Sequence, residues 1–204
     1  MDLSFIRQRL AQPLPGLDAQ MTMAPPIRRR DVAVPEDARR SAVLVLIYPF
    51  DNQWIVPFMR RTDDARIHAG QVCFPGGRRE PGDPDFQFTA LREADEEMGI
   101  PHQEVEVLGA LTEVYIPPSN SLVFPFLGYL PARPVFVPAP REVADIIEVP
   151  LSQLLDPAIR GTHRVDVFGG NMIEAPGYVV HEKHLIWGAT AMMIAELAAL
   201  LARE

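Results

Sequence analysis

Three glutamates in one short stretch constrain the chemistry of this chain more than any other feature. Glu93, Glu96 and Glu97 are spaced i, i+3 and i+4, so a helix would project all three carboxylates from one side. Carboxylates held that close repel one another unless a cation lies between them. Because the ligand atoms are all oxygens, the pattern predicts a site for Mg²⁺ or Mn²⁺ rather than for zinc.

The surrounding residues predict the limits of this helix. Its apolar spacing indicates a start at Phe86 or Thr89 and a continuation to Met98. Gly99 would end the helix, because glycine adopts the left-handed backbone conformation at little cost. Pro101 would prevent a restart, since it lacks the N–H group that a helix needs.

A glycine pair upstream of the helix predicts a second part of the same site. Residues 71–74 are predicted to form a short strand that leads into a tight turn at Gly76 and Gly77. Since glycine has no side chain, the backbone there can approach a ligand closely. We therefore predict that both glycines contact the substrate.

An arginine at the start of the glutamate cluster has two sets of candidate partners. Arg92 can pair with Glu96 four residues later, or with Asp83 or Asp85 in the preceding loop. Either pairing would orient a carboxylate and limit the repulsion between like charges. We predict that Arg92 belongs to the catalytic site in a structural role, without contacting the substrate.

The composition excludes several classes of function. The formal net charge of −8 disfavours general binding to nucleic acid or to an anionic membrane. The single cysteine, Cys73, excludes an internal disulfide and fits a reducing compartment such as the cytoplasm. The N-terminus lacks the pattern of a secretory signal, and the apolar residues near the C-terminus are too few for a membrane span.

The order of predicted elements indicates a short N-terminal region and one larger domain. Residues 1–40 are predicted to form a short helix, over 1–11, followed by an extended arm rich in proline and arginine. Residues 41–204 are predicted to form a single domain. Strands and helices mix there without regular βαβ alternation, which favours the α/β class with a mixed sheet between helices, an α/β/α sandwich.

A continuous apolar run, residues 41–48, is predicted to form a central strand, and a turn at Asp51 and Asn52 leads to its hairpin partner. Pro125 suggests that its own strand is an edge strand or carries a bulge. The last helix, over 186–203, has more apolar surface than one face needs, so it lies in the core or forms the seam of a homodimer. The remaining predicted elements are the hairpin partner at 54–60, strands at 104–111, 122–130, 163–168 and 175–181, and a short helix at 150–155.

These motifs resemble the signature of Nudix hydrolases over about residues 40–200. The stretch between Gly77 and Arg92 is one residue longer than in the common signature. This extension and the motif before it resemble the coenzyme A pyrophosphatase branch. The residues that carry the resemblance are Arg61, Thr62, Arg66, Gly70, Phe74, Pro75, Gly76, Gly77, Asp83, Arg92, Glu93, Ala94, Glu96, Glu97, Gly99 and Ile100.

The resemblance implies the Nudix fold and a divalent-metal-dependent hydrolysis of a pyrophosphate that joins a nucleoside phosphate to another group. It implies coenzyme A or an acyl derivative as substrate, with 3′,5′-ADP and 4′-phosphopantetheine as products. Glu93, Glu96 and Glu97 would bind the metal, and Glu96, Glu97 and Arg92 would be catalytic. The substrate would contact Arg61, Arg66, Gly76 and Gly77, where the guanidinium groups suit phosphate oxygens.

Three questions stay open at this point. Tyr115 and Pro117 lie where other branches of the superfamily carry their markers, so ADP-ribose, NADH and dinucleoside polyphosphates are alternative substrates. A nucleotide-sensing module with little turnover is an alternative of another class. The general base is either one of the helix glutamates or a distant carboxylate, with Glu113, Glu142 and Asp145 as candidates.

Overall fold

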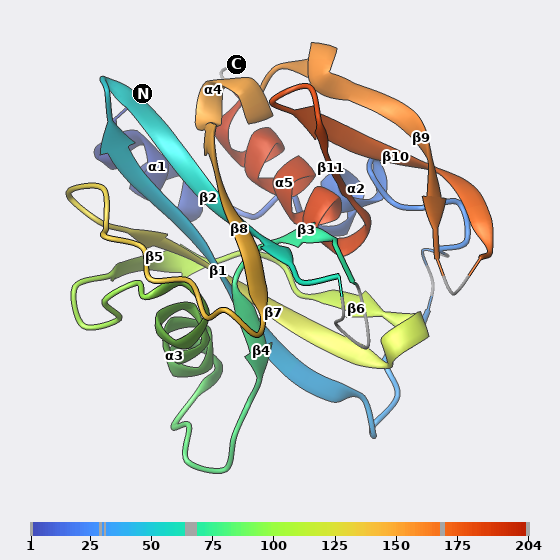
Figure 1. Ribbon diagram of the computed structural model, residues 1–204, viewed down its shortest axis with the longest axis horizontal. Helices are drawn as coiled ribbons and strands as arrows, with labels where there is room; N and C mark the ends of the chain where they lie inside the picture. Colours follow the sequence, from blue (N-terminus) through green and yellow to red (C-terminus); the bar gives the residue numbers. More distant parts are fainter. Residues whose placement is uncertain (1, 29, 31, 64–68, 168–169, 203–204) are drawn as a thin grey trace.

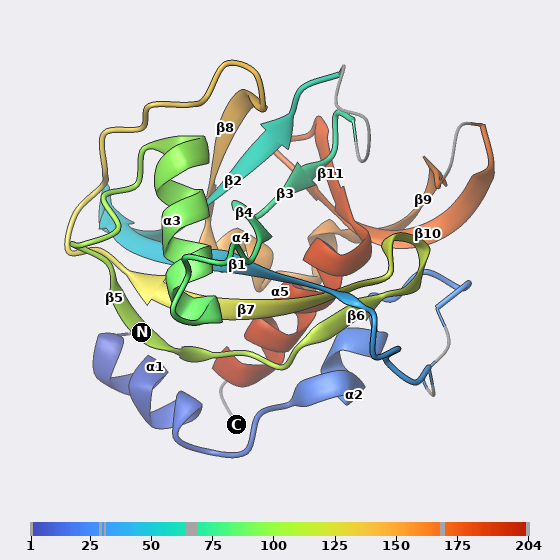
Figure 2. The ribbon, with the colours of Figure 1, turned by 90° about the horizontal axis from the view of Figure 1, so that it is seen from below.

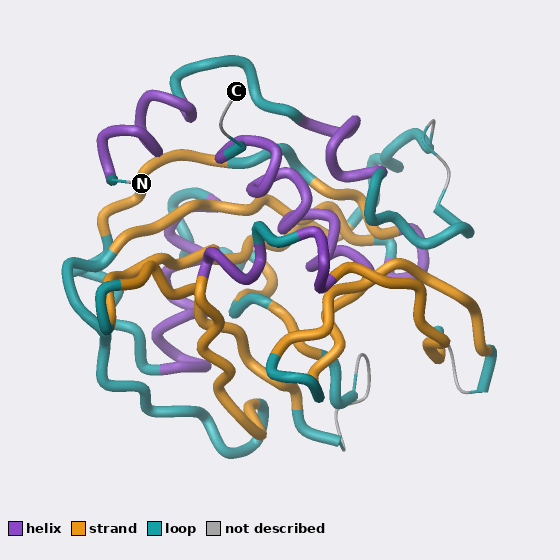
Figure 3. The backbone as a smooth tube through the Cα atoms, turned by 90° about the horizontal axis from the view of Figure 1, so that it is seen from above, coloured by secondary structure: helices purple, strands orange, loops and turns teal. Residues whose placement is uncertain are grey.

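The computed structural model describes residues 2–28, 30, 32–63, 69–167 and 170–202. A mixed sheet lies between helices, which confirms the predicted α/β/α fold class (Figures 1 and 2). α3 (Phe86–Met98) covers one face of the sheet, and α5 (Gly188–Leu201) covers the other. α1 (Leu3–Leu10) and α2 (Gly16–Met21) pack outside α5 (Figure 3).

The main sheet has eight strands, and β1 lies at its centre as predicted. The strand order is β3-β2-β1-β7-β5, while β4 pairs with β1, β6 with β7 and β8 with β2. Only the pairing of β1 with β7 is parallel among these described strands. The strands are β1 (Arg39–Phe50), β2 (Gln53–Arg61), β3 (Val72–Cys73), β4 (Gly76–Arg78), β5 (Glu106–Ala110), β6 (Val114–Ile116), β7 (Ser121–Tyr129) and β8 (Val143–Pro150).

A second, three-stranded sheet and three short helices complete the described chain. The sheet has the order β11-β10-β9. Its strands are β9 (Arg160–Asp166), β10 (Met172–Val180) and β11 (His184–Trp187), and the short helices are η1 (Pro117–Ser119), α4 (Leu151–Leu154) and η2 (Pro157–Ile159). No helix in the described part of the chain is both long and apolar enough to cross a membrane.

The apolar run of β1 is buried on both sides because a helix covers each face of the sheet. Val45 and Ile47 pack in the core beneath α5, whereas Leu44 and Leu46 pack in the core beneath α3. The predicted hairpin follows β1, since Asp51 and Asn52 both have positive φ, 49° and 61°. A two-residue turn with that geometry matches the twist of the strands it joins.

Three sequence expectations are corrected by the fold. The glycine pair is the strand β4 rather than a tight turn, because Gly76 and Gly77 pair with β1. The arm is not extended throughout, since α2 lies within it. Pro125 lies in an interior strand, so the edge alternative is wrong. It lies in the gap between the part of β7 that pairs with β5 and the part that pairs with β6, where residues 111–113 lie opposite residues 124–125 as in a bulge. Because neither β5 nor β6 pairs with Pro125, its missing N–H group costs no ladder hydrogen bond on the side of β7 that faces these two strands.

α5 lies in the core, which was one of the two places expected for the last helix. Its residues are buried nearly all round, including the carboxylate of Glu196, which is 0% exposed. Glu196 accepts hydrogen bonds from Gln20 Nε2 at 2.8 Å and from the Thr112 backbone N–H at 3.1 Å. This contact fixes α2 to α5 and to the connection between β5 and β6.

We expect Gln20→Ala to lower the free energy of unfolding by about 2 kcal/mol, because the buried Glu196 carboxylate would lose a donor. The melting temperature, followed by circular dichroism, should fall by about 4–8 °C. Gln8→Ala is the matched control, since Gln8 is exposed on α1. Equal melting temperatures for the two variants would show that the Gln20 contact does not stabilise the fold.

Candidate active site

The position of the glutamate helix is set at both of its ends. The Asp85 carboxylate accepts a hydrogen bond from the Phe88 N–H at 2.7 Å, which caps the first turn of α3. Gly99 ends the helix with φ 70°, as predicted. Beyond it, the loop that leads to β8 is hydrogen-bonded to the end of α3, through Val137 N–H to Met98 C=O and Ala139 N–H to Glu97 C=O.

Two of the three glutamates converge on the glycine strand. The Gly76 N–H donates to Glu97 Oε2 at 2.7 Å. Gly77 faces Glu93 so closely that a Cβ atom there would lie 2.4 Å from Glu93 Cδ. A Cβ on Gly76 would lie 2.3 Å from the Ala42 carbonyl oxygen. Both positions therefore require glycine, and the backbone of β4 and the two carboxylates form one compact group.

We expect Gly77→Ala to reduce kcat by about tenfold or more, because the new methyl group would displace the Glu93 carboxylate. The rate is measured on the nucleotide that the protein hydrolyses fastest, with circular dichroism to verify the fold. Gly82→Ala serves as control, since a Cβ there has no described atom within 4 Å. An unchanged kcat in Gly77→Ala would show that the position of Glu93 does not matter for turnover.

Arg92 contacts four groups around the helix. They include Glu96 and Asp83, one partner from each of the two sets that the sequence suggested. Its Nε and Nη2 atoms lie 3.0 Å from the two oxygens of Asp83. Its Nη2 lies 2.9 Å from Glu93 Oε1 and also donates to the Arg78 carbonyl at 3.1 Å. Its Nη1 donates to Glu96 at 3.0 Å. Asp85, the other suggested partner, caps α3 instead.

Glu96 lies at the rim of the site rather than on the glycine strand. Its side chain is 60% exposed and is held by Arg92, whereas that of Glu97 is 4% exposed. Among the residues that the structure describes, no three His, Cys, Asp or Glu side chains are grouped closely enough to hold a metal ion. The described arrangement thus presents two converging carboxylates and a third one beside them.

Burial determines the electrostatics of the two converging glutamates. Desolvation raises the pKa of Glu97 to about 8, and the nearby charges of Glu93 and Glu142 contribute to the increase. The hydrogen bond from the Gly76 N–H acts in the opposite direction. Desolvation also raises the pKa of Glu93. In contrast, the hydrogen bonds from Arg92 hold the pKa of Asp83 well below its usual range.

One of the two predicted substrate-binding arginines, Arg61, lies beside the carboxylates. Arg61 ends β2, is 27% exposed, and places Nη1 3.8 Å from Glu97 Oε1. Its charge also acts on the thiol of Cys73, whose pKa burial raises to about 12. Arg61 is therefore beside the carboxylates and the glycine strand. Arg66 lies outside the described residues.

Of the three distant carboxylates considered as a base, Glu142 has a charge that acts on the helix glutamates. Its charge raises the pKa of both Glu93 and Glu97. The backbone holds it there, because the Thr62 N–H donates to the Glu142 carbonyl at 3.1 Å. The proline-rich sequence before Glu142 gives no sign of this position, which depends on the pairing of β8 with β2.

The fold is a mixed sheet between helices, and its candidate site holds two glutamates against the glycine strand β4. Comparison with known proteins identifies the family that has this arrangement. The NUDIX domain model matches residues 38–165, more than half of the chain. The chain therefore belongs to the Nudix family. It is a pyrophosphohydrolase that acts on nucleoside diphosphate derivatives, and such hydrolases generally use divalent metals.

Two relatives agree with this assignment, and one solved structure agrees with the fold. The Nudix hydrolase NudL of Photorhabdus laumondii is 40% identical over 183 residues, which cover 88% of this chain and 91% of the relative. NudL of Yersinia pestis is 38% identical over 164 residues, 78% of each chain. The Nudix hydrolase RenU of M. smegmatis has a TM-score of 0.56 at 18% identity, covering 82% of this chain and 89% of its own, and supports the fold alone.

Proposed function

We propose that this protein hydrolyses the pyrophosphate bond of coenzyme A or an acyl derivative and releases 3′,5′-ADP and 4′-phosphopantetheine. The observation that supports a pyrophosphate site is the convergence of Glu93 and Glu97 on Gly76 and Gly77. The choice of coenzyme A is supported by the motif upstream of the glycines. In that motif, Arg61 places Nη1 3.8 Å from Glu97 Oε1, so a guanidinium that suits phosphate oxygens lies beside the carboxylates.

The donor set fits a divalent cation. Glu93 and Glu97 offer carboxylate oxygens beside the backbone of β4, and such oxygens suit Mg²⁺ or Mn²⁺. We assign Glu93, Glu96 and Glu97 to the cation. Because Arg92 holds Glu96 at the rim, the Glu96 side chain would have to turn towards the other two to bind it. When bound, such a cation neutralises developing phosphate charge and lowers the pKa of water.

The protein's own groups have distinct roles in this proposal. Gly76 orients Glu97 through its N–H group, and Arg92 positions Glu93 and Glu96. Arg61 and Arg66 bind substrate phosphates. Glu142 is the favoured residue for accepting the proton from the attacking water, because its charge acts on both Glu93 and Glu97.

A substrate screen tests the proposal. Coenzyme A, ADP-ribose, NADH and diadenosine tetraphosphate are each incubated with the protein and Mg²⁺ or Mn²⁺, and the products are identified and quantified over time by mass spectrometry without further enzymatic treatment. We expect the highest kcat/KM for coenzyme A, with 3′,5′-ADP among the products. Fast ADP-ribose turnover without coenzyme A turnover would refute the substrate while leaving the reaction class intact.

A further inference from the structure

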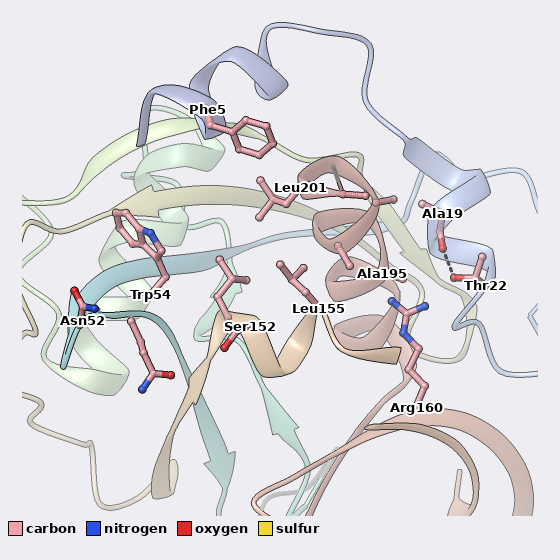
Figure 4. Close-up of a pocket in the computed structure, with 15 residues that line it drawn as sticks. Phe5, Ala19, Thr22, Asn52, Trp54, Ser152, Leu155, Arg160, Ala195 and Leu201 are labelled. Carbon is pink, nitrogen blue, oxygen red and sulfur yellow. Dashed lines mark hydrogen bonds between the residues drawn. The ribbon is translucent and has the colours of Figure 1, made fainter. Parts of the chain in front are cut away.

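A groove of about 690 Å³ lies on the α5 side of the main sheet, away from the glutamate helix (Figure 4). Its walls come from α1, α2, the start of β2, α4, β9 and α5. This volume is in the range of sites that hold small molecules. The groove is separated from Glu93 and Glu97 by the sheet itself, so it is not part of the pyrophosphate site.

The lining of the groove is chiefly apolar, with a cation at one side. Figure 4 shows Phe5, Trp54, Leu155 and Leu201 around it. These four side chains come from α1, β2, the residue after α4, and α5, and they are buried or half-buried, so the groove is built by the tertiary fold. Arg160 is the only charged side chain among the described residues that line it. Its guanidinium is held over the Tyr178 ring, 5.6 Å from the ring centroid.

We propose that this groove binds an amphipathic carboxylate, an alkyl chain of medium length with one acidic group. The apolar walls would remove the chain from water, and the Arg160 guanidinium would take the carboxylate in a two-hydrogen-bond fork. A single cation matches a single negative charge and not a polyphosphate. In a protein with a formal net charge of −8, attraction of an anion to this groove depends on that one residue.

Calorimetric titration with decanoate tests the proposal, with decanol as the uncharged ligand of equal chain length. We expect decanoate to bind and to raise the melting temperature, because it binds only the folded state. Arg160→Gln should weaken decanoate binding by about tenfold, the effect of losing one charge-assisted contact. Arg164→Gln is the matched control, since Arg164 is also exposed on β9 but does not line the groove.

A second variant tests the apolar part of the site. Ala199 lines the groove and is half-buried, so Ala199→Phe should fill it and abolish decanoate binding while circular dichroism shows an intact fold. Failure of decanoate to bind the wild-type protein at about 1 mM, a weak limit for any specific site, would overturn the proposal. Equal affinities of the wild-type protein and Arg160→Gln would also overturn it, as would equal affinities for decanoate and decanol. None of these results depends on which pyrophosphate is hydrolysed.

Discussion

Glu97→Gln is expected to lower kcat by about three orders of magnitude while leaving the protein folded. Glutamine keeps the shape of the side chain and an oxygen that can accept the Gly76 N–H, now bonded to Glu97 at 2.7 Å. The substitution removes only the negative charge that this side chain, which is 4% exposed, would offer to a cation. A cation site that uses this carboxylate would therefore lose affinity without any change in packing.

The measurement separates metal binding from stability. Mn²⁺ affinity, followed by electron paramagnetic resonance, should fall together with kcat, whereas the melting temperature without added metal should not decrease. Glu104→Gln is the matched control, because Glu104 is exposed and lies outside the site. Wild-type kcat and Mn²⁺ affinity in Glu97→Gln would refute the assignment of Glu97 to the cation.

Elements that depend on local residues are the ones that the sequence predicts well. The end of α3 follows from Gly99, whose φ of 70° needs no distant contact. The β1–β2 hairpin follows from the turn residues Asp51 and Asn52. The spacing of Glu93 and Glu97 likewise predicts that both project from one side of a helix. In each of these three cases, the local structure is determined by a few residues that are neighbours in the sequence.

Elements that depend on distant partners are not predictable in this way. Gly76 and Gly77 have the composition of a turn, but their pairing with Ala42 and Val43, more than thirty residues earlier, makes them a strand. α2 is a six-residue helix, too short to be stable alone, and Gln20 anchors it to Glu196 near the other end of the chain. No local pattern reports either contact.

In the candidate site, too, some features follow from local sequence and others depend on distant contacts. Helical spacing places the three glutamates on one side but does not say which of them face the glycine strand. Arg92 decides this for Glu96, which it holds at the rim. The sequence also offered Glu113, Glu142 and Asp145 as equal candidates for a base. The pairing of β8 with β2 places the Glu142 backbone beside Thr62, and the charge of Glu142 raises the pKa of Glu93 and Glu97.

Arg92→Ala is expected to lower the free energy of unfolding by about 3 kcal/mol, because Asp83 would remain buried without its cation. Asp83 is 4% exposed, and it would keep only the donors from Thr89 and the Glu80 backbone. The melting temperature should fall by about 6–12 °C. The kcat should also fall by about a hundredfold, because Glu93 and Glu96 lose the group that positions them.

The pH dependence of stability tests whether loss of the Arg92–Asp83 contact causes the lower stability of Arg92→Ala. Arg92 hydrogen bonds lower the pKa of Asp83 in the folded state, so the stabilisation is present above the unfolded pKa of about 3.9 and is lost as the pH falls toward the lower folded pKa. In Arg92→Ala, stability should therefore change less with pH below about 4 than in the wild-type protein.

A matched control and a double variant complete this test. Arg141→Ala also removes a guanidinium, but Arg141 is exposed, so its melting temperature and acid dependence should match those of the wild-type protein. Asp83→Asn in the Arg92→Ala background removes the uncompensated charge and should recover part of the lost stability, but not the lost kcat. Equal recovery of both would mean that Arg92 acts only through the fold. Recovery of stability alone would show that Arg92 separately positions the glutamates.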